Sequence, residues 1–441
     1  MGFRKVENTV SIFGLGYVGS ICLGCLVKMG YNVIGVDINR KKLKLLKEGK
    51  SPVMEKGLDT LIAKGIKSGR IFLTTSPYKA VSNSSISLVC VGTPSKSDGD
   101  INYRSLKNVC GDIGKAMLNK RAFHIIVIRS TVLPTTTRKI VIPLLERKSK
   151  KIAGVDFGVV VNPEFLRESS GVEDFFNPSK IIVGEFDKKS AEKLISLYQN
   201  ISAPLFKVSV ETAEMIKYID NVWHALKISF TNEVGVMCRK LNIDANQLMK
   251  IFCADTKLNI SPSYLMPGNA FGGSCLPKDV KAFNRLGDKL EVEIPLINSI
   301  LHSNTVHLNR IFSIICRYRP HKIGFLGVTF KPDTDDVRES PIVKLIALLK
   351  NKGYEVFAYD ENLISHPLMG ENKRYLDKLL PRFEKFLYRD PFKLSKDVDF
   401  LVVSHKKYKE VVKRCGDDKI ILELVPLGMK DRKKRQFGIC W

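Results

Sequence analysis

The stretch TVSIFGLGYVGSICLGCLVKMGYNVIGVD, residues 9–37, decides the fold of the first part of the chain. A β-branched apolar run enters a glycine-rich turn, a helical segment follows, and a second apolar run ends in an acid 21 residues after the middle glycine. Such glycines permit a tight turn, close approach of a pyrophosphate and helix packing, while the helix N-terminus attracts phosphate. The stretch therefore predicts a Rossmann unit that binds a dinucleotide at Gly14, Gly16, Gly19 and Asp37.

The acid at the end of the second strand indicates which dinucleotide is bound. We expect Asp37 to accept hydrogen bonds from the adenosine ribose and to repel a 2′-phosphate, so the sequence favours NAD over NADP. Arg40, Lys41 and Lys42 follow closely and weaken this preference.

Polar residues follow three later apolar runs, which we expect to be strands over 87–92, 125–128 and 158–161. In an open parallel sheet, ligands bind beyond the carboxyl ends of the strands. We therefore expect Thr93, Thr131 and Glu164 to face one crevice. Glu168 lies four residues after Glu164, so a helical segment would place both carboxylates on one face. The alternative is a solvated pair at a helix start, where the dipole favours acids.

The turn Gly272-Gly273-Ser274-Cys275-Leu276-Pro277-Lys278-Asp279 is typical of a nucleophile. A nearby ammonium favours the reactive thiolate, and a carboxylate four residues on can serve as a general base for water. The alternative is a buried Cys that packs as a small hydrophobe. We expect that packing role for the nine other cysteines, including the C-x-x-C pair Cys22 and Cys25 on the first helix.

A long helix is predicted from Val210 to Leu241, with Lys217, Asn221 and His224 on one face. A fixed cation and an amide donor are what an oxyanion beside a thiolate needs, although His224 alone would more often be a core histidine. Apolar residues occupy more than one face of this helix, which predicts burial on several sides. Because two Rossmann domains cannot cover all of it, the pattern predicts a homodimer formed across the helix.

The last part of the chain repeats the first pattern without the glycine turn. Residues 322–327 and 354–359 are expected strands, the second ending in Asp360, and a helix is expected over 342–350 between them. Phosphate recognition would then fall to side chains such as Lys331. The predicted fold class is α/β, with two Rossmann-like, doubly wound parallel-sheet domains joined by a long central helix and a helical dimerisation region. We expect an NAD-binding domain over 1–209, a central helical region that carries Cys275 over 210–307, and a second Rossmann-like domain for a phosphate-bearing ligand over 308–441.

Composition restricts the function classes. The chain has 441 residues, 44% of them hydrophobic and 26% charged, which is typical of globular proteins with about three domains. The net charge of +26 is spread along the chain without an aromatic-interleaved basic motif, so we interpret it as surface charge that also attracts anionic ligands, and not as a nucleic-acid or membrane site. No paired metal-type cysteine spacing or signal-peptide core occurs, so we expect no metal and a cytoplasmic location.

The chain resembles the nucleotide-sugar 6-dehydrogenases over essentially its whole length. The resemblance rests on Phe13 to Gly19, on Asn162 to Glu168, on the cysteine turn, and on Lys331 with Arg338-Glu339-Ser340-Pro341. The GDP-mannose branch of that family is the most similar, because of Asn221-Val222-Trp223-His224-Ala225, Lys257-Leu258-Asn259, Leu276 and the final Gly438-Ile439-Cys440-Trp441. UDP-glucose 6-dehydrogenases share the core motifs but tend to have Phe at the position of Leu276, and they remain the alternative.

The resemblance implies a four-electron oxidation of the C6 alcohol of a nucleotide sugar, as in precursor synthesis for polysaccharides such as alginate. Cys275 would capture the aldehyde as a thiohemiacetal, a second NAD would oxidise this to a thioester, and water would release the carboxylate. The resemblance further implies roles for these residues: Lys217 and Asn221 at the oxyanion; Thr131, Glu164 and Asp279 at the water; Glu168, His224, Asn232, Tyr264, Gly272 and Lys331 near the sugar nucleotide; Tyr17, Val18, Lys42, Thr93, Lys278 and Arg338 near NAD.

The segment from 259 to 270 departs from the pattern. In the family this arm completes the partner subunit's sugar site, and here Ser263, Met266 and Asn269 replace a Tyr, a basic residue and an aromatic. These changes bear on sugar preference and leave the catalytic set intact.

Two other function classes remain open. One is a two-electron NAD dehydrogenase, which would have no use for Cys275 with Lys217. The other is a basic binding protein without catalysis.

Overall fold

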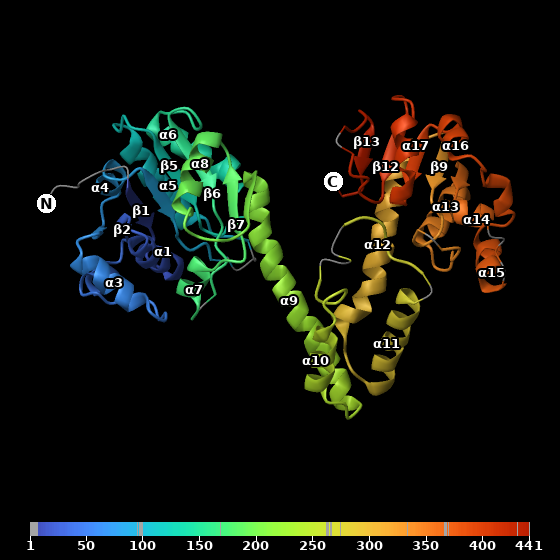
Figure 1. The fold of residues 1–441 in the computed structure, drawn as a ribbon, viewed down its shortest axis with the longest axis horizontal. Helices are drawn as coiled ribbons and strands as arrows, with labels where there is room; N and C mark the ends of the chain where they lie inside the picture. Colours follow the sequence, from blue (N-terminus) through green and yellow to red (C-terminus); the bar gives the residue numbers. More distant parts are fainter. Residues whose placement is uncertain are drawn as a thin grey trace. The chain divides into compact units, whose positions relative to one another are not determined.

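The computed structural model describes residues 8–440, apart from 95, 97–99, 168, 262–263, 265–266, 274, 333, 366–367, 369 and 430. The chain forms two compact units, Met1–Ala225 and Leu226–Trp441, coloured blue to green and green to red in Figure 1. Each unit has its own sheet and its own hydrophobic core.

The first unit contains an eight-stranded sheet in the order β3-β2-β1-β4-β5-β6-β7-β8. Its strands are β1 (Thr9–Phe13), β2 (Asn32–Val36), β3 (Ile71–Thr74), β4 (Ile86–Val89), β5 (His124–Ile128), β6 (Phe157–Val161), β7 (Ile181–Glu185) and β8 (Leu205–Ser209). The strand order reverses between β1 and β4, which is the switch point where α/β sheets bind their ligands. The predicted doubly wound fold is therefore confirmed for this unit.

One strand pair departs from the parallel sheet that was predicted. β6 and β7 pair antiparallel, with Val161 opposite Gly184. Among the described residues of the connection between them there is one helix, α7 (Gly171–Phe176), of six residues. A parallel return usually crosses the face of the sheet through an α-helix, and a helix of six residues is too short to run the length of the strands. The chain therefore comes back beside β6 in the opposite direction, and β8 then pairs parallel with β7.

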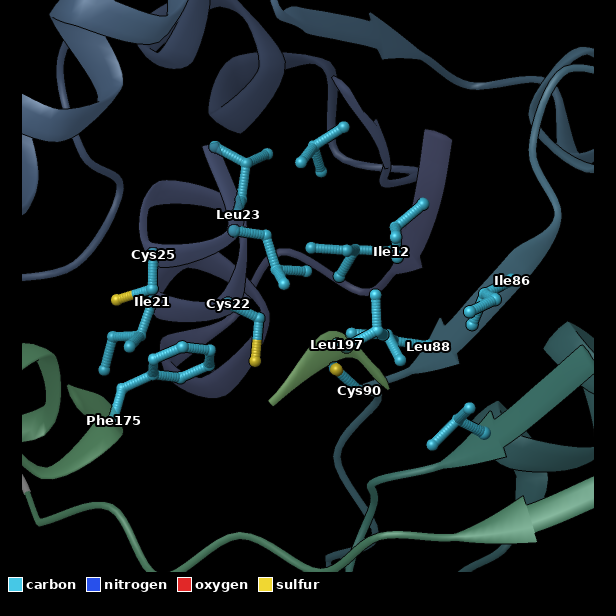
Figure 2. Close-up of a cluster of buried hydrophobic side chains, with 14 of the residues drawn as sticks. Ile12, Ile21, Cys22, Leu23, Cys25, Ile86, Leu88, Cys90, Phe175 and Leu197 are labelled. Atoms are coloured by element: carbon cyan, nitrogen blue, oxygen red, sulfur yellow. The ribbon is translucent and has the colours of Figure 1, made fainter. Parts of the chain in front are cut away.

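Helices cover both faces of this sheet. They are α1 (Tyr17–Lys28), α2 (Arg40–Lys47), α3 (Leu58–Lys67), α4 (Pro77–Ser82), α5 (Arg104–Met117), the π-helix η2 (Thr137–Val141), α6 (Ile142–Ser149), α7 and α8 (Lys188–Leu197). Because side chains alternate along a strand, Ile12 and Phe13 enter different cores on opposite faces. Figure 2 shows the core in which Cys22 and Cys25 pack, both with no exposed area. Their predicted packing role is confirmed.

The second unit contains a five-stranded, all-parallel sheet in the order β10-β9-β11-β12-β13. Its strands are β9 (Lys322–Leu326), β10 (Glu355–Tyr359), β11 (Phe400–Val403), β12 (Ile420–Glu423) and β13 (Gln436–Gly438). Its helices are α10 (Ala245–Ala254), α11 (Leu276–Leu290), α12 (Pro295–Arg317), α13 (Pro341–Asn351), α14 (Glu361–Ser365), α15 (Gly370–Leu379), α16 (Pro391–Asp397) and α17 (Lys409–Arg414), with 3-10 turns η3 (Phe383–Phe386) and η4 (Lys406–Tyr408). This order is the second common doubly wound topology.

The helical sequence after the cysteine turn forms two helices where continuous helical sequence to residue 317 was expected. Glu291 adopts a left-handed φ of 53° at the end of α11, and Pro295 begins α12. A left-handed residue ends a helix, and proline is tolerated only in the first turn of the next one. The interruption between α11 and α12 is therefore confined to residues 291–294.

The long helix α9 (Val210–Lys240) confirms the prediction for this segment. Every residue from 221 to 229 is exposed, including Val222, Leu226 and Ile228. Within the part of the chain that the structure describes, no helix is both long enough and apolar enough to cross a membrane.

Six of the nine cysteines other than Cys275 are buried as predicted. Cys253 and Cys440 are exposed and Cys316 is half-buried, so the predicted packing role was wrong for these three.

Candidate active site

The glycine turn between β1 and α1 has the shape that a dinucleotide requires. Gly14 has a φ of +92°, and a Cβ there would lie 2.8 Å from Cγ1 of Val91. A Cβ at Gly19 would lie 1.9 Å from the carbonyl oxygen of Gly14. A Cβ at Gly16, in contrast, would meet nothing within 4 Å, so open space lies at the N-terminus of α1. Tyr17 begins that helix, whose first N–H groups lack intrahelical acceptors and can bind phosphate.

Asp37 closes the other side of the cofactor cavity, which has a volume of about 740 Å³. One carboxylate oxygen accepts the Leu15 N–H at 2.8 Å and the other accepts the Asn39 N–H at 2.8 Å. Lys42 Nζ lies 3.7 Å away. Each carboxylate oxygen can accept a further hydrogen bond, so Asp37 can still receive the ribose hydroxyls. Asp37, Lys42, Gly14 and Gly16 thus line one cavity that fits NAD.

Replacing Asp37 by Ala is expected to lower the affinity for NAD relative to NADP by about tenfold, the effect of one lost hydrogen bond to a charged group. The ratio is the informative quantity, because the substitution also frees the Leu15 N–H and so weakens both cofactors. Fluorescence titration with each cofactor measures it. Asp112→Ala, which removes another acid of the same cavity, should leave the ratio unchanged. An unchanged ratio in Asp37→Ala would contradict the ribose contact.

Thr93 and Thr131 follow β4 and β5 and lie against each other, whereas Glu164 lines a separate cavity with Lys217, so the common crevice expected for all three stays a prediction. The Thr93 hydroxyl donates to the Thr131 carbonyl oxygen at 2.6 Å. The loop after Thr131 is held by Glu214, which accepts the N–H groups of Thr135 at 2.6 Å and Thr137 at 2.8 Å. Burial raises the pKa of the Glu214 carboxyl.

A second cavity of the first unit, about 450 Å³ in volume, contains the predicted Lys, Asn and His of α9. Lys217 Nζ lies 3.1 Å from Glu164 Oε1, and each side chain is only 12% exposed. Asn221 and His224 line the same cavity, so their predicted common face is confirmed. His224 is exposed at this wall, so a buried core role is excluded. The cavity therefore presents a shielded ammonium, a carboxylate and an amide to a ligand.

The segment after Glu164 is not helical, contrary to the arrangement considered for its two acids. Residues 162–167 form an irregular turn, in which Glu164 Oε2 accepts the Leu166 N–H at 2.7 Å. The Glu164 carboxylate thus binds a backbone N–H of its own segment, which competes with helical hydrogen bonding there. Glu168 lies outside the described residues.

The cysteine turn of the second unit packs tightly on the segment after β9. A Cβ at Gly272 would lie 2.4 Å from the Glu339 carbonyl oxygen, and a Cβ at Gly273, whose φ is +86°, would lie 2.8 Å from the Phe330 ring. Cys275 is exposed and precedes the first residue of α11. The glycines thus let this turn present a thiol while pressed against a neighbouring loop.

The charged neighbours of Cys275 are on α11. Lys278 Nζ lies 3.2 Å from Asp279 Oδ1, and both side chains are about 70% exposed, at 72% and 69%. The Asp279 N–H donates to the Cys275 carbonyl oxygen at 2.8 Å. Both groups therefore lie within one helical turn of the thiol, as the sequence predicted.

The loop after β9 holds the other predicted residues of this unit. Lys331 is exposed, with its Nζ 5.4 Å from the Phe330 ring centre. The Arg338 guanidinium donates to the Asp336 carboxylate at 3.0 and 2.8 Å, and the Arg338 N–H donates to it at 2.9 Å. Asp360, fully buried, accepts the N–H groups of Val328 at 2.7 Å and Thr329 at 3.0 Å, as Asp37 does for its own turn.

The remaining residues expected near the sugar nucleotide lie on α9 and in the arm from 259 to 270, which is only partly described. Asn232 is exposed on α9. In the arm, Tyr264 is 85% exposed with a left-handed φ of 62°. Asn269 is half-buried, whereas Ser263 and Met266 lie outside the described residues.

Three regions of the chain match the successive domains of one enzyme family. Residues 8–202 match the NAD binding domain, residues 211–306 the central domain, and residues 324–424 the UDP binding domain of the UDP-glucose/GDP-mannose dehydrogenase family. The chain belongs to this UDP-glucose/GDP-mannose dehydrogenase family. It is therefore an NAD-dependent dehydrogenase.

Full-length relatives lie within the UDP-glucose/GDP-mannose dehydrogenase family. The chain is 43% identical to the GDP-mannose 6-dehydrogenase of Pseudomonas aeruginosa, over 98% of this chain and 100% of the relative. It is 32% identical to the UDP-glucose 6-dehydrogenase TuaD of Bacillus subtilis, over 83% and 79% of the two chains. A crystal structure of a ternary complex of the Pseudomonas aeruginosa GDP-mannose dehydrogenase superimposes with a TM-score of 0.95 and 43% identity, over 98% of this chain and 100% of that chain.

Sequence reasoning missed a buried cation in this family member. Arg129 follows β5, is 6% exposed, and donates to the Asn162 side chain and, at 3.0 Å, to the Tyr198 hydroxyl. The nearby Tyr198 and thiols raise the pKa of this guanidinium against its burial, so it stays charged. The sequence signal that could have identified Arg129 is its position directly after a predicted strand, which is the reason that Thr131 was selected.

Proposed function

We propose that the protein is a GDP-mannose 6-dehydrogenase, which oxidises the C6 alcohol of GDP-mannose to the carboxylate of GDP-mannuronate with two NAD. The observation that carries the sugar assignment is the 43% identity to the Pseudomonas aeruginosa enzyme over both full lengths, against 32% to a UDP-glucose enzyme over 83% of this chain. We also propose that it acts in the cytoplasm and supplies a uronate precursor for a polysaccharide such as alginate. The domain limits at residues 209 and 307 stay a prediction.

The proposed reaction uses one thiol for two oxidations. The alcohol, two NAD and one water give the carboxylate, two NADH and three protons. NAD, when bound, accepts the hydride in each oxidation. Cys275 adds to the aldehyde and forms a C–S bond as a thiohemiacetal, whose oxidation leaves a thioester. Water then attacks the thioester carbon, the C–S bond breaks, and the thiolate returns.

The remaining residues would act on charge and water. Lys217 and Asn221 stabilise the oxyanion that forms at C6, because a shielded ammonium and an amide favour it more than the neutral carbonyl. Glu164, Thr131 and Asp279 orient or activate the water. The residues assigned to the sugar nucleotide are Glu168, Asn232, His224, Tyr264, Gly272 and Lys331. The residues assigned to NAD are Gly14, Gly16, Tyr17, Val18, Gly19, Asp37, Lys42, Thr93, Lys278 and Arg338.

Counting NADH per sugar tests this function. With limiting GDP-mannose and excess NAD, two NADH per sugar are expected, together with a GDP-linked uronate in the product. A yield of one NADH would indicate a two-electron dehydrogenase. UDP-glucose and UDP-N-acetylmannosamine are the comparison substrates, and two NADH from UDP-glucose alone would overturn the sugar assignment.

The proposed enzyme is a homodimer joined across α9. The nine consecutive exposed positions 221–229 include Val222, Trp223, Leu226 and Ile228, and a helix apolar on several faces needs a partner. Tyr264, in the arm from 259 to 270, is 85% exposed and would complete the partner's sugar site. Stable dimers bury about 1,200 Å² or more in total, which a helix of 31 residues and this arm can provide.

Subunit mixing tests the dimer. Sedimentation at assay concentration should give a dimer, and Leu226→Glu should shift it to an inactive monomer. Mixing inactive Cys275→Ser with Tyr264→Ala should restore activity, because one of the two composite sites in a heterodimer is then intact. A fully active monomer would contradict the arrangement.

A further inference from the structure

Tyr17 connects the cofactor turn to the wall of the 450 Å³ cavity. Its main chain begins α1 directly after the glycine turn. Its hydroxyl lies against Glu55 Oε2 and 2.7 Å from the carbonyl oxygen of Arg167, a residue that lines the cavity. Burial and the nearby Glu55 raise the pKa of the Tyr17 hydroxyl, so it remains a donor.

Glu55 is the buried acceptor at the centre of this arrangement. It precedes α3 and is only 9% exposed. Oε2 contacts Tyr17, while Oε1 accepts the Val172 N–H from the first turn of α7 at 3.4 Å. A buried carboxylate is costly unless hydrogen-bonded, so these donors account for its position. Glu55 lines neither the cofactor cavity nor the 450 Å³ cavity, which excludes a direct ligand contact there.

The segment held in this way, residues 164–174, is internally tied. Asp174 accepts hydrogen bonds from the Arg167 N–H at 2.9 Å, from Arg167 Nη2 at 2.7 Å and from the Ser170 hydroxyl at 3.1 Å. A Cβ at Gly171 would lie 2.8 Å from the Tyr17 hydroxyl oxygen and 2.4 Å from Ile21 Cδ1. The described residues of this segment, 164–167 and 169–174, are therefore tied to one another, and their contacts with Tyr17 and Glu55 hold them against α1.

We propose that Glu55 is a positioning residue for the reaction: through Tyr17 and Val172 it places the 164–174 segment against the cofactor turn, and so couples NAD binding to sugar-nucleotide binding. The inference rests on the proposed function for the identity of the sugar. Coupling is reciprocal, so each ligand must strengthen binding of the other by the same factor. That factor should depend on Glu55 and on the Tyr17 hydroxyl.

Four variants test the proposal. Glu55→Ala should raise the KM for GDP-mannose about tenfold, as expected for one lost hydrogen bond to a charged group, and change the Kd for NAD in the absence of sugar less than about twofold. Glu55→Gln keeps an acceptor and should recover most of the loss. Tyr17→Phe, which removes only the hydroxyl, should raise the KM for GDP-mannose as much as Glu55→Ala does, and the double variant should be no worse than either. Met54→Ala, at the adjacent 97% exposed side chain, is the matched control.

Two readouts separate this role from a general loss of stability. The wild type should bind NAD about tenfold more tightly with GDP-mannose present, the same factor as for the sugar, and Tyr17→Phe should lose that gain. Hydrogen exchange of peptides covering 164–174 should quicken in Glu55→Ala and not in Met54→Ala. Equal exchange in the two variants, additive effects in the double variant, or a parallel loss of kcat and NAD affinity would overturn the proposal. Hydrogen exchange is measured without substrate. Unchanged exchange in Glu55→Ala would therefore contradict the positioning role alone, whereas a wild type that releases no NADH from GDP-mannose would contradict the proposed function.

Discussion

Cys275→Ser is expected to lower net oxidation of the sugar at least about 1,000-fold while NAD binding is retained. A serine hydroxyl is a much poorer nucleophile at neutral pH than a thiolate, and loss of a nucleophile costs several orders of magnitude in kcat. The side chain is exposed at the start of α11, so the substitution should not disturb a core. NADH release under steady-state conditions and NAD titration measure the two effects.

The matched control for this substitution is another exposed thiol. Cys253→Ser on α10 should keep near-normal turnover. In a single turnover, Cys275→Ser should yield at most one NADH per site, because only the first oxidation can proceed without a thiol. Near-normal turnover in Cys275→Ser would rule out the covalent mechanism.

Lys217→Met is expected to lower kcat by about 100- to 1,000-fold, the usual effect of removing one oxyanion-stabilising group. Lys217 and Glu164 are 3.1 Å apart and each 12% exposed, so water cannot readily replace the lost cation. The substitution also leaves the shielded Glu164 carboxylate without its ion-pair partner, which is costly for a buried charge. Steady-state kinetics with NAD saturating measure the loss.

Lys180→Met is the matched control for Lys217→Met. Lys180 lines the same cavity and forms a comparable ion pair, 2.6 Å from Asp220, but is assigned no part in stabilising the oxyanion. It should change kcat by less than about tenfold. Equal losses in the two variants would show that cavity charge in general is needed, and would contradict a specific role for Lys217.

Local patterns were sufficient to predict most elements. The glycine turn, the strands that end at Thr93, Thr131 and Glu164, the length of α9 and the second Rossmann-like unit all follow from period and turn chemistry within a few residues. The antiparallel direction of β7 was not predictable, because the run IIVGE has no feature that specifies which way its neighbour runs. The break before α12 was missed although Pro295 signals the start of a helix; the left-handed Glu291 that ends α11 carries no residue signal of its own.

For the candidate site, the sequence by itself determined which chemical groups occur and which of them share an element. Helical spacing placed Lys217, Asn221 and His224 on one face, and the cysteine turn placed Asp279 one helical turn after the thiol. Tertiary structure alone decided which groups meet across long separations: Glu55 with Tyr17, 38 residues apart, and Gly272 against Glu339. The physical reason is that spacing along one element follows from its fixed geometry, whereas contacts between elements depend on how their side chains pack.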